Sequence, residues 1–215
     1  ELADYVVTEP GFGADLGAEK FMDIKCRQSE LWPDTVVLVA TVRALKHHGG
    51  CPKEELSKEN VPCLQKGMEN LLAHISHVQH VWRRPVVVAI NRFVSDTQAE
   101  MECLRAACEK VGAPVALCDG WAHGGEGARA LAELVCATAD KQETVSPSYT
   151  YTDDMPLKEK IEAVAMRIYG AGDVSFGAGV LKQLTKLTDE GFGHCPVCIA
   201  KTQYSFSDNP KALGA

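Results

Sequence analysis

The chain has 215 residues and a formal net charge of −7, with 46% hydrophobic and 24% charged residues. This is enough for one large or two small domains with an apolar core, and the negative charge argues against a general nucleic-acid or anionic-membrane binder. No apolar run approaches the roughly 18 residues that a membrane helix needs. The nine cysteines are an odd number scattered along the chain, which favours reduced thiols in a cytoplasmic protein over a disulfide framework.

The N-terminal stretch predicts a strand, a glycine-rich turn and a helix. The chain opens with Glu1, and residues 4–8 already form an apolar, strand-like run, which suggests a piece of a longer protein. The turn contains Gly11, Gly13 and Gly17. Glycines permit a tight turn and a close approach of the backbone to a phosphate. The third glycine comes one place later than in the dinucleotide-binding motif, so an ordinary strand-to-helix turn is the alternative.

Two acidic residues lie in the helix after this turn. Asp15 and Glu19 are one helical turn apart and therefore share a face. They would suit a cation or an amine, although a solvated acidic first turn is the commoner arrangement.

A second apolar strand is expected over residues 35–42, and a polar cluster follows it directly. The cluster contains two cations, two imidazoles and two glycines: Arg43, Lys46, His47, His48, Gly49 and Gly50. Arg and Lys at the carboxyl end of a central strand would neutralise phosphate or carboxylate charge. We favour this functional interpretation over a basic loop that pairs with nearby acids.

Residues 52–82 are expected to be mostly helical and carry His74, His77 and His80. The i, i+3 spacing can bring two imidazoles to one metal ion, but three at this spacing drift around a helix, and no acidic residue lies among them. No metal site is therefore predicted.

The most apolar run, residues 86–90, predicts a strand buried on both faces, as in a parallel sheet. Asp96 or Thr97 then caps a helix expected over residues 98–110. Phe93 therefore lies just beyond the carboxyl end of a central strand, at the edge where open α/β sheets bind ligands.

The next strand, expected over residues 113–118, is followed by Trp121 and by a glycine-rich helix start that contains Gly124 and Gly125. If the two strands are neighbours, Phe93 and Trp121 can face each other and form a slot for a flat heteroaromatic ring. The alternative is that both rings cap the core, and position alone does not decide between the two.

The remaining expected elements are the helices 128–140, 156–169 and 180–190 and the strand 196–200, with a polar connector over residues 142–154. We therefore predict an α/β fold with a mostly parallel sheet and helices on both faces, a three-layer arrangement of the Rossmann-like or P-loop NTPase-like kind. Residues 1–141 would form the α/β core segment with the ligand crevice. Residues 142–215 would supply the connector, helices and a further strand of the same or an adjoining domain.

One CxxC pair, Cys195 and Cys198, enters the last expected strand. Redox pairs of this kind usually stand at a helix start, and no second pair completes a zinc site. We expect two buried structural thiols.

Several segments together carry a family resemblance: residues 11–15, 19–21, 24–27, 39–46, 49–50 and 200–205. The run Val-Ala-Thr-Val-Arg-Ala-Leu-Lys-x-His-Gly-Gly, which starts at Val39, is a highly specific signature, and the segments 91–93 and 121–127 also fit in the right order. With these residues the chain resembles the formate–tetrahydrofolate ligase family, whose members are also called 10-formyltetrahydrofolate synthetases. The resemblance covers nearly the whole chain and is nearer to the bacterial single-function form.

The resemblance implies an enzyme that joins formate to tetrahydrofolate in an ATP-dependent reaction. Formate would take the γ-phosphoryl group to give formyl phosphate, and N10 of tetrahydrofolate would then attack the formyl carbon. ATP with Mg²⁺ would bind as a substrate, and no tightly bound cofactor, nucleic acid or membrane is expected. The full-length protein would be a cytoplasmic homo-oligomer.

Site residues also follow from the resemblance. Members that resemble this chain hold the pterin ring between a phenylalanine and a tryptophan at positions that match Phe93 and Trp121. Arg43 and Lys46, inside the signature, are expected to be catalytic. The residues expected on the nucleotide and phosphate side are Gly11, Gly13, Asp15, Thr41, Gly49, Gly50, Gly124 and Gly125.

Two departures qualify the resemblance. The family's GxxxxGK[ST] phosphate loop and its Lys-Gly-Gly-Ala-Ala-Gly-Gly-Gly-Tyr signature, both upstream in the family, do not occur in these 215 residues, and the family's carboxyl-terminal part after Ala215 is missing. We therefore expect a central fragment that has no ligase activity alone. The alternatives are a nucleotide- or dinucleotide-binding α/β domain without a ligase role and a structural or assembly segment.

Overall fold

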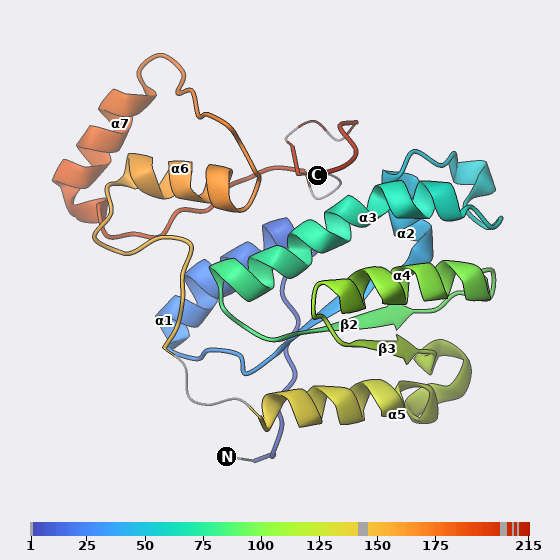
Figure 1. Ribbon diagram of the computed structural model, residues 1–215. Coiled ribbons are helices and arrows are strands. Elements are labelled where there is room, and N and C mark those ends of the chain that lie inside the picture. Colours follow the sequence, from blue (N-terminus) through green and yellow to red (C-terminus); the bar gives the residue numbers. More distant parts are fainter. Residues whose placement is uncertain (1, 142–145, 203–205, 208, 210) are drawn as a thin grey trace. The chain divides into compact units, whose positions relative to one another are not determined.

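The computed structural model describes residues 2–141, 146–202, 206–207, 209 and 211–215, and Figure 1 shows it as a ribbon. The chain forms two compact units, which we describe separately. The first consists of Glu1–Val7, Pro33–Ser146 and Leu213–Ala215, and the second of Thr8–Trp32 and Pro147–Ala212. The stretch Thr8–Trp32 thus clusters with the second unit, although it precedes residue 141 in the chain. The expected connector, residues 142–154, lies partly outside the described residues.

The first unit is built on a parallel sheet with the strand order β1-β2-β3. The strands are β1 (Val36–Ala40), β2 (Val86–Asn91) and β3 (Val115–Cys118). In the register of the sheet, Val36 pairs with Val86 and Val88 pairs with Val115. β2 is central and buried from Val86 to Ile90, because its side chains are covered on both faces. The predicted α/β fold with a mostly parallel sheet is confirmed.

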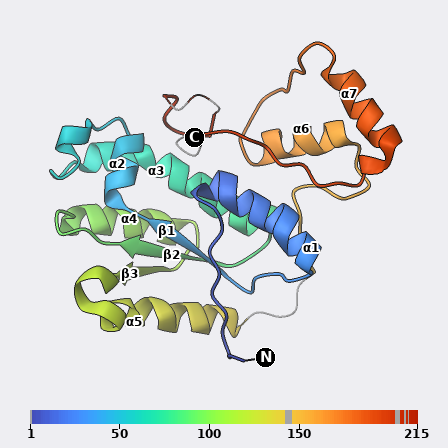
Figure 2. The same cartoon turned by 180° about the vertical axis from the view of Figure 1, so that it is seen from behind.

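Helices cover both faces of this sheet (Figure 1, Figure 2). On one face lie α3 (Val61–Ser76), which η4 (His77–Val81) extends, and α4 (Gln98–Lys110). On the other face lies α5 (Gly120–Ala139). α2 (Val42–His48) follows β1 and packs against α3, and the short η3 (Lys53–Glu55) lies between α2 and α3 in the chain. The unit therefore has the three layers that the sequence predicts.

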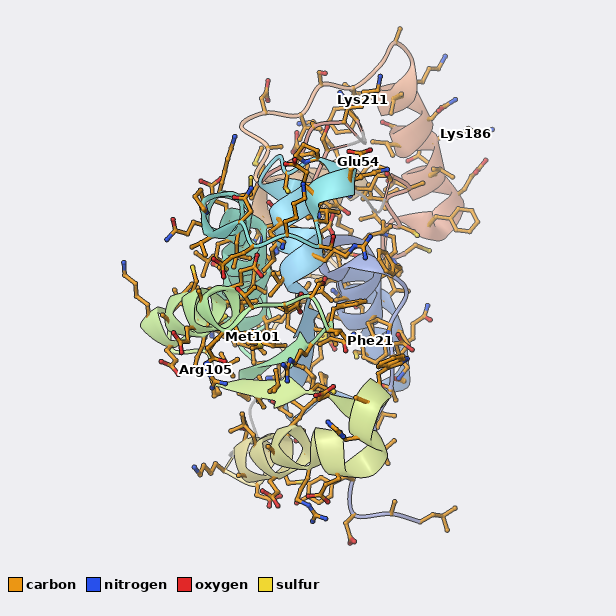
Figure 3. All side chains as sticks on the ribbon, turned by 90° about the vertical axis from the view of Figure 1, so that its right-hand side faces the viewer. Phe21, Glu54, Met101, Arg105, Lys186 and Lys211 are labelled. Atoms are coloured by element: carbon orange, nitrogen blue, oxygen red, sulfur yellow. The ribbon has the colours of Figure 1, made fainter. Side chains whose placement is uncertain are left out.

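α4 shows how local sequence sets a helix in this fold. Its bounds, Gln98–Lys110, agree with the predicted residues 98–110. The helix begins with a reciprocal capping box between Thr97 and Glu100, a strong start signal. Its buried residues Glu100, Leu104 and Cys108 recur every fourth position, whereas Arg105 on another face is exposed (Figure 3).

Two expected strands are wrong. Residues 4–8 and 196–200 form no strand, and Val6 and Val7 are exposed. An apolar run becomes a strand only where a neighbouring edge supplies partners for its backbone groups, and in the structure neither segment pairs with one. The expectation of buried thiols in the CxxC pair is also wrong, because both cysteines are exposed; all nine cysteines are free.

The second unit consists of helical segments: η1 (Gly13–Ala18), η2 (Phe21–Cys26), α1 (Arg27–Ser29), α6 (Leu157–Arg167), α7 (Val180–Leu187) and η5 (Thr188–Phe192). Hydrogen bonds tie its two stretches of chain together. The buried carboxylate of Asp23 accepts bonds from Thr150 N at 2.7 Å and Thr150 Oγ1 at 2.5 Å, and Arg27 donates to the carbonyl oxygen of Tyr151 at 2.7 Å. In the described part of the chain, no helix is both long and apolar enough to cross a bilayer.

Candidate functional site

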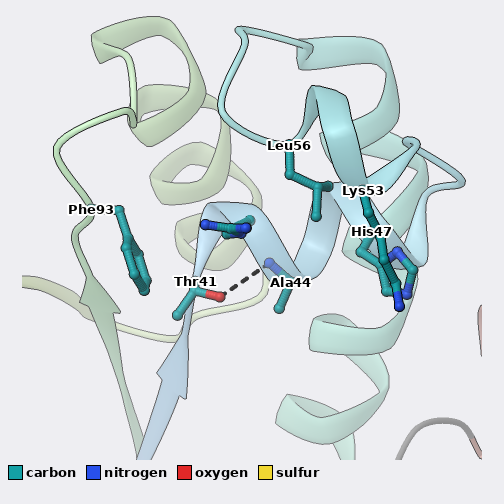
Figure 4. Close-up of a pocket in the computed structure, with 7 residues that line it drawn as sticks. Thr41, Ala44, His47, Lys53, Leu56 and Phe93 are labelled. Carbon is teal, nitrogen blue, oxygen red and sulfur yellow. Dashed lines mark hydrogen bonds between the residues drawn. The ribbon is translucent and has the colours of Figure 1, made fainter.

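A pocket lies in the first unit where β1 and β2 end. Its lining residues come from α2, from the segment that follows α2 and from the turn after β2: Thr41, Arg43, Ala44, His47, Lys53, Leu56 and Phe93 (Figure 4). The carboxyl edge of an open parallel sheet is where proteins of this architecture bind ligands. The pocket therefore stands at the place that the sequence predicts, and three of the expected site residues, Thr41, Arg43 and Phe93, contribute to it.

The first wall of the pocket belongs to α2. The polar cluster is thus helical rather than a loop, but one of its cations, Lys46, does pair with an acid, as the alternative expected. The helix begins directly after β1 because Thr41 caps it: the Thr41 hydroxyl accepts a hydrogen bond from Ala44 N at 3.1 Å. Arg43 and His47 are four residues apart and therefore lie on one face of the helix, toward the pocket. Arg43 is exposed, so its guanidinium remains accessible to an anionic ligand.

Glycines fix the position of α2 against α3. A Cβ atom at Gly49 would lie 1.8 Å from the carbonyl oxygen of Cys63, and one at Gly67 would lie 1.8 Å from the carbonyl oxygen of Leu45. The two helix backbones thus touch at a place where no side chain fits. Gly49, expected on the phosphate side, has this packing role in the structure, whereas Gly50 has a φ of +89° and open space around it.

The second wall of the pocket is the turn that carries Phe93. Phe93 N donates to Asp96 Oδ2 at 2.9 Å, and Asp96 N donates to the carbonyl oxygen of Phe93 at 3.0 Å. Burial raises the pKa of Asp96, against the lowering effect of the hydrogen bond from Phe93. Phe93 is 43% exposed, so part of its side chain is accessible to a ligand in the pocket and the rest is covered by the protein.

Trp121 stands at the end of the neighbouring strand. β2 and β3 are adjacent and parallel, which is the condition for Phe93 and Trp121 to lie at one edge of the sheet. Trp121 lies in the first turn of α5 and is 86% exposed, but it does not line the pocket. Asp119, two residues before Trp121, has a carboxylate 3.6 Å from both Arg92 Nη1 and His123 Nε2.

The expected glycines of this region lie within the start of α5. Gly124 has φ 57° and ψ −142°, so it separates the turn that carries Trp121 from the rest of the helix. Gly125 has open space around it. Asp119 N donates to the carbonyl oxygen of Gly127 at 2.9 Å, which folds the first turn back on the helix.

Lys46 is not in the pocket, although it belongs to the same helix as Arg43. Its side chain is fully buried, and Nζ lies 2.8 Å from Glu100 Oε1. Burial tends to raise the pKa of Glu100, but hydrogen bonds from Lys46, Asn60 and Thr97 outweigh it and lower that pKa below its ordinary value. Sequence reasoning missed Glu100 as a partner, although Thr97-x-x-Glu100 is a recognisable capping-box pattern.

The expected N-terminal site residues belong to the second unit. Gly13 has a φ of +84°, and a Cβ at Gly17 would lie 1.6 Å from the carbonyl oxygen of Gly11, so the turn is closed tightly on itself. Asp15 is buried and pairs with Lys201 Nζ at 2.7 Å. Glu19 is buried as well, and burial raises its pKa to about 7, against the lowering effect of Lys20 at 3.1 Å. A solvated acidic first turn is therefore wrong, and Asp15 holds an amine of the chain itself.

The helical histidines do not form a metal centre on the described residues. The rings of His74 and His77 meet edge to face with centroids 6.1 Å apart. Within the ranges that the structure describes, no three His, Cys, Asp or Glu side chains gather closely enough to hold a metal ion.

The pocket, with Phe93 and the cation of Arg43 in its lining, lies where β1 and β2 end, and Trp121 follows β3 outside the pocket. The fold is thus that of an open parallel α/β protein, a class that binds ligands at this edge of its sheet. A family model described as formate–tetrahydrofolate ligase matches residues 1–215. The chain therefore belongs to the formate–tetrahydrofolate ligase family, and the resemblance noted in the sequence is confirmed.

Proteins named formate–tetrahydrofolate ligase from three bacteria illustrate the similarity. Those of Hyphomonas neptunium and Symbiobacterium thermophilum are 56% and 54% identical to this chain over 215 residues, and that of Methylibium petroleiphilum is 50% identical over 217 residues. Each comparison covers 100% of this chain but only 38%, 38% and 39% of the respective relative. The chain thus spans less than two fifths of the length of these relatives.

Proposed function

We propose that this chain is the folate-binding part of an enzyme that ligates formate to tetrahydrofolate with ATP and Mg²⁺. The products are 10-formyltetrahydrofolate, ADP and phosphate, and formyl phosphate is the intermediate. Family membership over all 215 residues supports the reaction class. The observation that carries the assignment of the site is the placement of two exposed aromatic rings after adjacent parallel strands.

Phe93 and Trp121 are the proposed pterin-binding residues. A pterin is flat, with apolar faces and a polar rim, so two rings can hold its faces and leave the rim free for directed hydrogen bonds. The backbone that carries Phe93 is fixed by the paired bonds to Asp96, and the turn that carries Trp121 is fixed by the bond from Asp119 to Gly127. Rigid mounting reduces the entropy lost when the ligand binds.

Arg43 is the proposed anion-binding residue of the pocket. It is exposed and lines the same pocket as Phe93, and a guanidinium forms bidentate hydrogen bonds with carboxylate or phosphate oxygens. Formate and the γ-phosphoryl group are both anions of this kind. The remaining nucleotide-side residues, Thr41 and the glycines together with Asp15, stay proposals that rest on the family signature.

The proposed surroundings of the enzyme follow from the same family membership. ATP with Mg²⁺ acts as a substrate, and no tightly bound cofactor is needed because both half-reactions are transfers between substrates. The full-length protein is proposed to be a cytoplasmic homo-oligomer.

The proposal is tested by titration of the full-length protein with tetrahydrofolate. Truncation of either ring in Phe93→Ala or Trp121→Ala should weaken binding about tenfold or more. Stacking contributes roughly 0.5–1.5 kcal/mol, the apolar area that the ring buries adds to this, and about 1.4 kcal/mol already corresponds to a factor of ten. Phe192→Ala, which removes an exposed ring of the second unit comparable to Phe93, is the matched control and should bind as the parent does. Circular dichroism first establishes that all three variants are folded. Unchanged affinity in both ring variants would show that the rings do not bind the pterin.

A further inference from the structure

The core beneath the pocket contains an ion pair that has no surface exposure. Lys46 on α2 and Glu100 on α4 are both fully buried, and their charged groups are 2.8 Å apart. The pair joins residues 54 positions apart in the chain. A charge pair of this kind is a poor means of stabilising a core, because desolvation cancels much of the attraction, and apolar residues of similar size often give equal or greater stability.

The pair is the centre of a larger set of hydrogen bonds. Lys46 Nζ also donates to the carbonyl oxygen of Lys58 at 2.9 Å. Glu100 Oε1 accepts a bond from Asn60 N at 2.9 Å, and Glu100 Oε2 accepts bonds from Thr97 N and Thr97 Oγ1 at 3.1 and 3.3 Å. Two side chains therefore connect α2, the segment before α3 and the start of α4. We call these five residues the Lys46–Glu100 network.

The segments that the network connects carry the two walls of the pocket. α2 bears Arg43 and His47, and the chain between α2 and residue 58 bears Lys53 and Leu56. On the other side of the pocket lies Phe93 (Figure 4), which precedes Thr97 by four residues in the chain. The bonds between Phe93 and Asp96 make that short connection rigid. Loss of the network's hydrogen bonds would therefore shift both α2 and the turn that carries Phe93, which form the two walls.

Lys46 has little left to offer a substrate. An ammonium group has three donors, and Lys46 uses two of them on Glu100 and on a backbone carbonyl. Because the side chain is fully buried, a substrate in the pocket does not meet it.

We propose that Lys46 and Glu100 are positioning residues that set the separation of the two pocket walls, and thereby the affinity for tetrahydrofolate. This inference rests on the proposed function, since it takes the pterin to bind against Phe93. Binding sites tolerate misplacement of only about half an ångström, and looser support of the residues that touch a ligand lowers affinity. The directional bonds of the network supply such support, which an apolar pair of the same volume cannot.

The decisive variant is the double substitution Lys46→Met/Glu100→Leu in the full-length protein. It leaves no unpaired buried charge, but it removes the partners of the Lys58 carbonyl and of the N–H groups of Asn60 and Thr97, so the protein should fold with a moderately lower thermal unfolding temperature. Calorimetric titration with tetrahydrofolate should nevertheless show binding at least about tenfold weaker. Glu100→Gln, which keeps the side-chain volume, should weaken binding in the same direction. Leu104→Ala is the matched control: Leu104 is fully buried on the same helix but lies outside the network, so this variant should lose stability and keep its affinity.

The possible results separate the inference from the proposed function. The positioning role is overturned if the folded double variant binds tetrahydrofolate within about twofold of the parent, or if Leu104→Ala loses as much affinity as the network variants. A double variant that does not fold would also overturn it, because the network would then be needed for the fold itself. A parent protein that fails to bind tetrahydrofolate would instead refute the proposed function.

Discussion

The contact between α2 and α3 leads to a quantitative prediction for Gly67→Ala. The added Cβ would lie 1.8 Å from the carbonyl oxygen of Leu45 and 2.8 Å from Gly49 N, both of them backbone atoms. Carbon and oxygen atoms need roughly 3 Å or more, so the helices would have to move apart by about an ångström. In an unobstructed helix the same substitution stabilises by about 1 kcal/mol. Overpacking of a rigid core costs about 1–3 kcal/mol and sometimes more, so the net effect should be a loss of stability.

The measurement is urea unfolding of the 215-residue chain, followed by circular dichroism. We expect a lower midpoint with an unchanged slope, which reports a loss of stability without a change in the surface exposed. The control is Gly125→Ala, because Gly125 lies within α5 with open space around it. That variant should be as stable as the parent or up to about 1 kcal/mol more stable. If Gly67→Ala unfolds at or above the midpoint of Gly125→Ala, the close contact of the two helices is incorrect.

Three further predictions follow from the same structure. Burial raises the pKa of Glu19 to about 7, so the folded state binds this proton more tightly than the unfolded state, and stability should decline as pH rises from about 4.5 toward 7. In thermal unfolding measured at several pH values, Glu19→Gln should flatten this decline. An unchanged pH profile of the unfolding temperature would contradict the assignment. Arg43→Ala in the full-length enzyme should raise KM for formate or ATP, or lower kcat, more than it changes KM for tetrahydrofolate; kinetic constants equal to those of the parent would argue against an anion-binding role. The 215-residue chain alone should release no ADP from ATP when formate is added. It has no GxxxxGK[ST] loop, whose lysine and backbone amides would stabilise the transferring phosphoryl group. Formate-dependent release of ADP by the purified chain would disprove the prediction.

Elements set by local sequence could be predicted. β2 is a β-branched run long enough to cross a sheet and too short for an ordinary helix, and α4 has a capping box at its start and a regular apolar face. Both were predicted within a residue, because the interactions that start and cover them are encoded nearby. Phe93 lies just beyond β2, as predicted, whereas Trp121 lies inside α5, a helix that the sequence placed only from residue 128 onward.

Elements that depend on distant partners could not be predicted. Residues 4–8 have the composition of a strand, but composition does not supply the neighbouring edge that a strand needs. Arg43 and Lys46 are one helical turn apart and carry the same charge, yet one faces the pocket and the other faces the core. The difference is decided by Glu100, a residue 54 positions away that only the folded chain brings to Lys46.

The family signature therefore combines residues with different physical duties. Thr41 starts α2 and lines the pocket, Lys46 enters the buried network, and Gly49 lets α2 touch α3, while Arg43 presents an exposed cationic side chain to the pocket. Three of the four thus have a structural role in placing the elements that form the pocket. Since a pocket built from two helices and a turn is only as well placed as their contacts, a sequence motif that is specific for the activity need not consist of residues that touch the substrate.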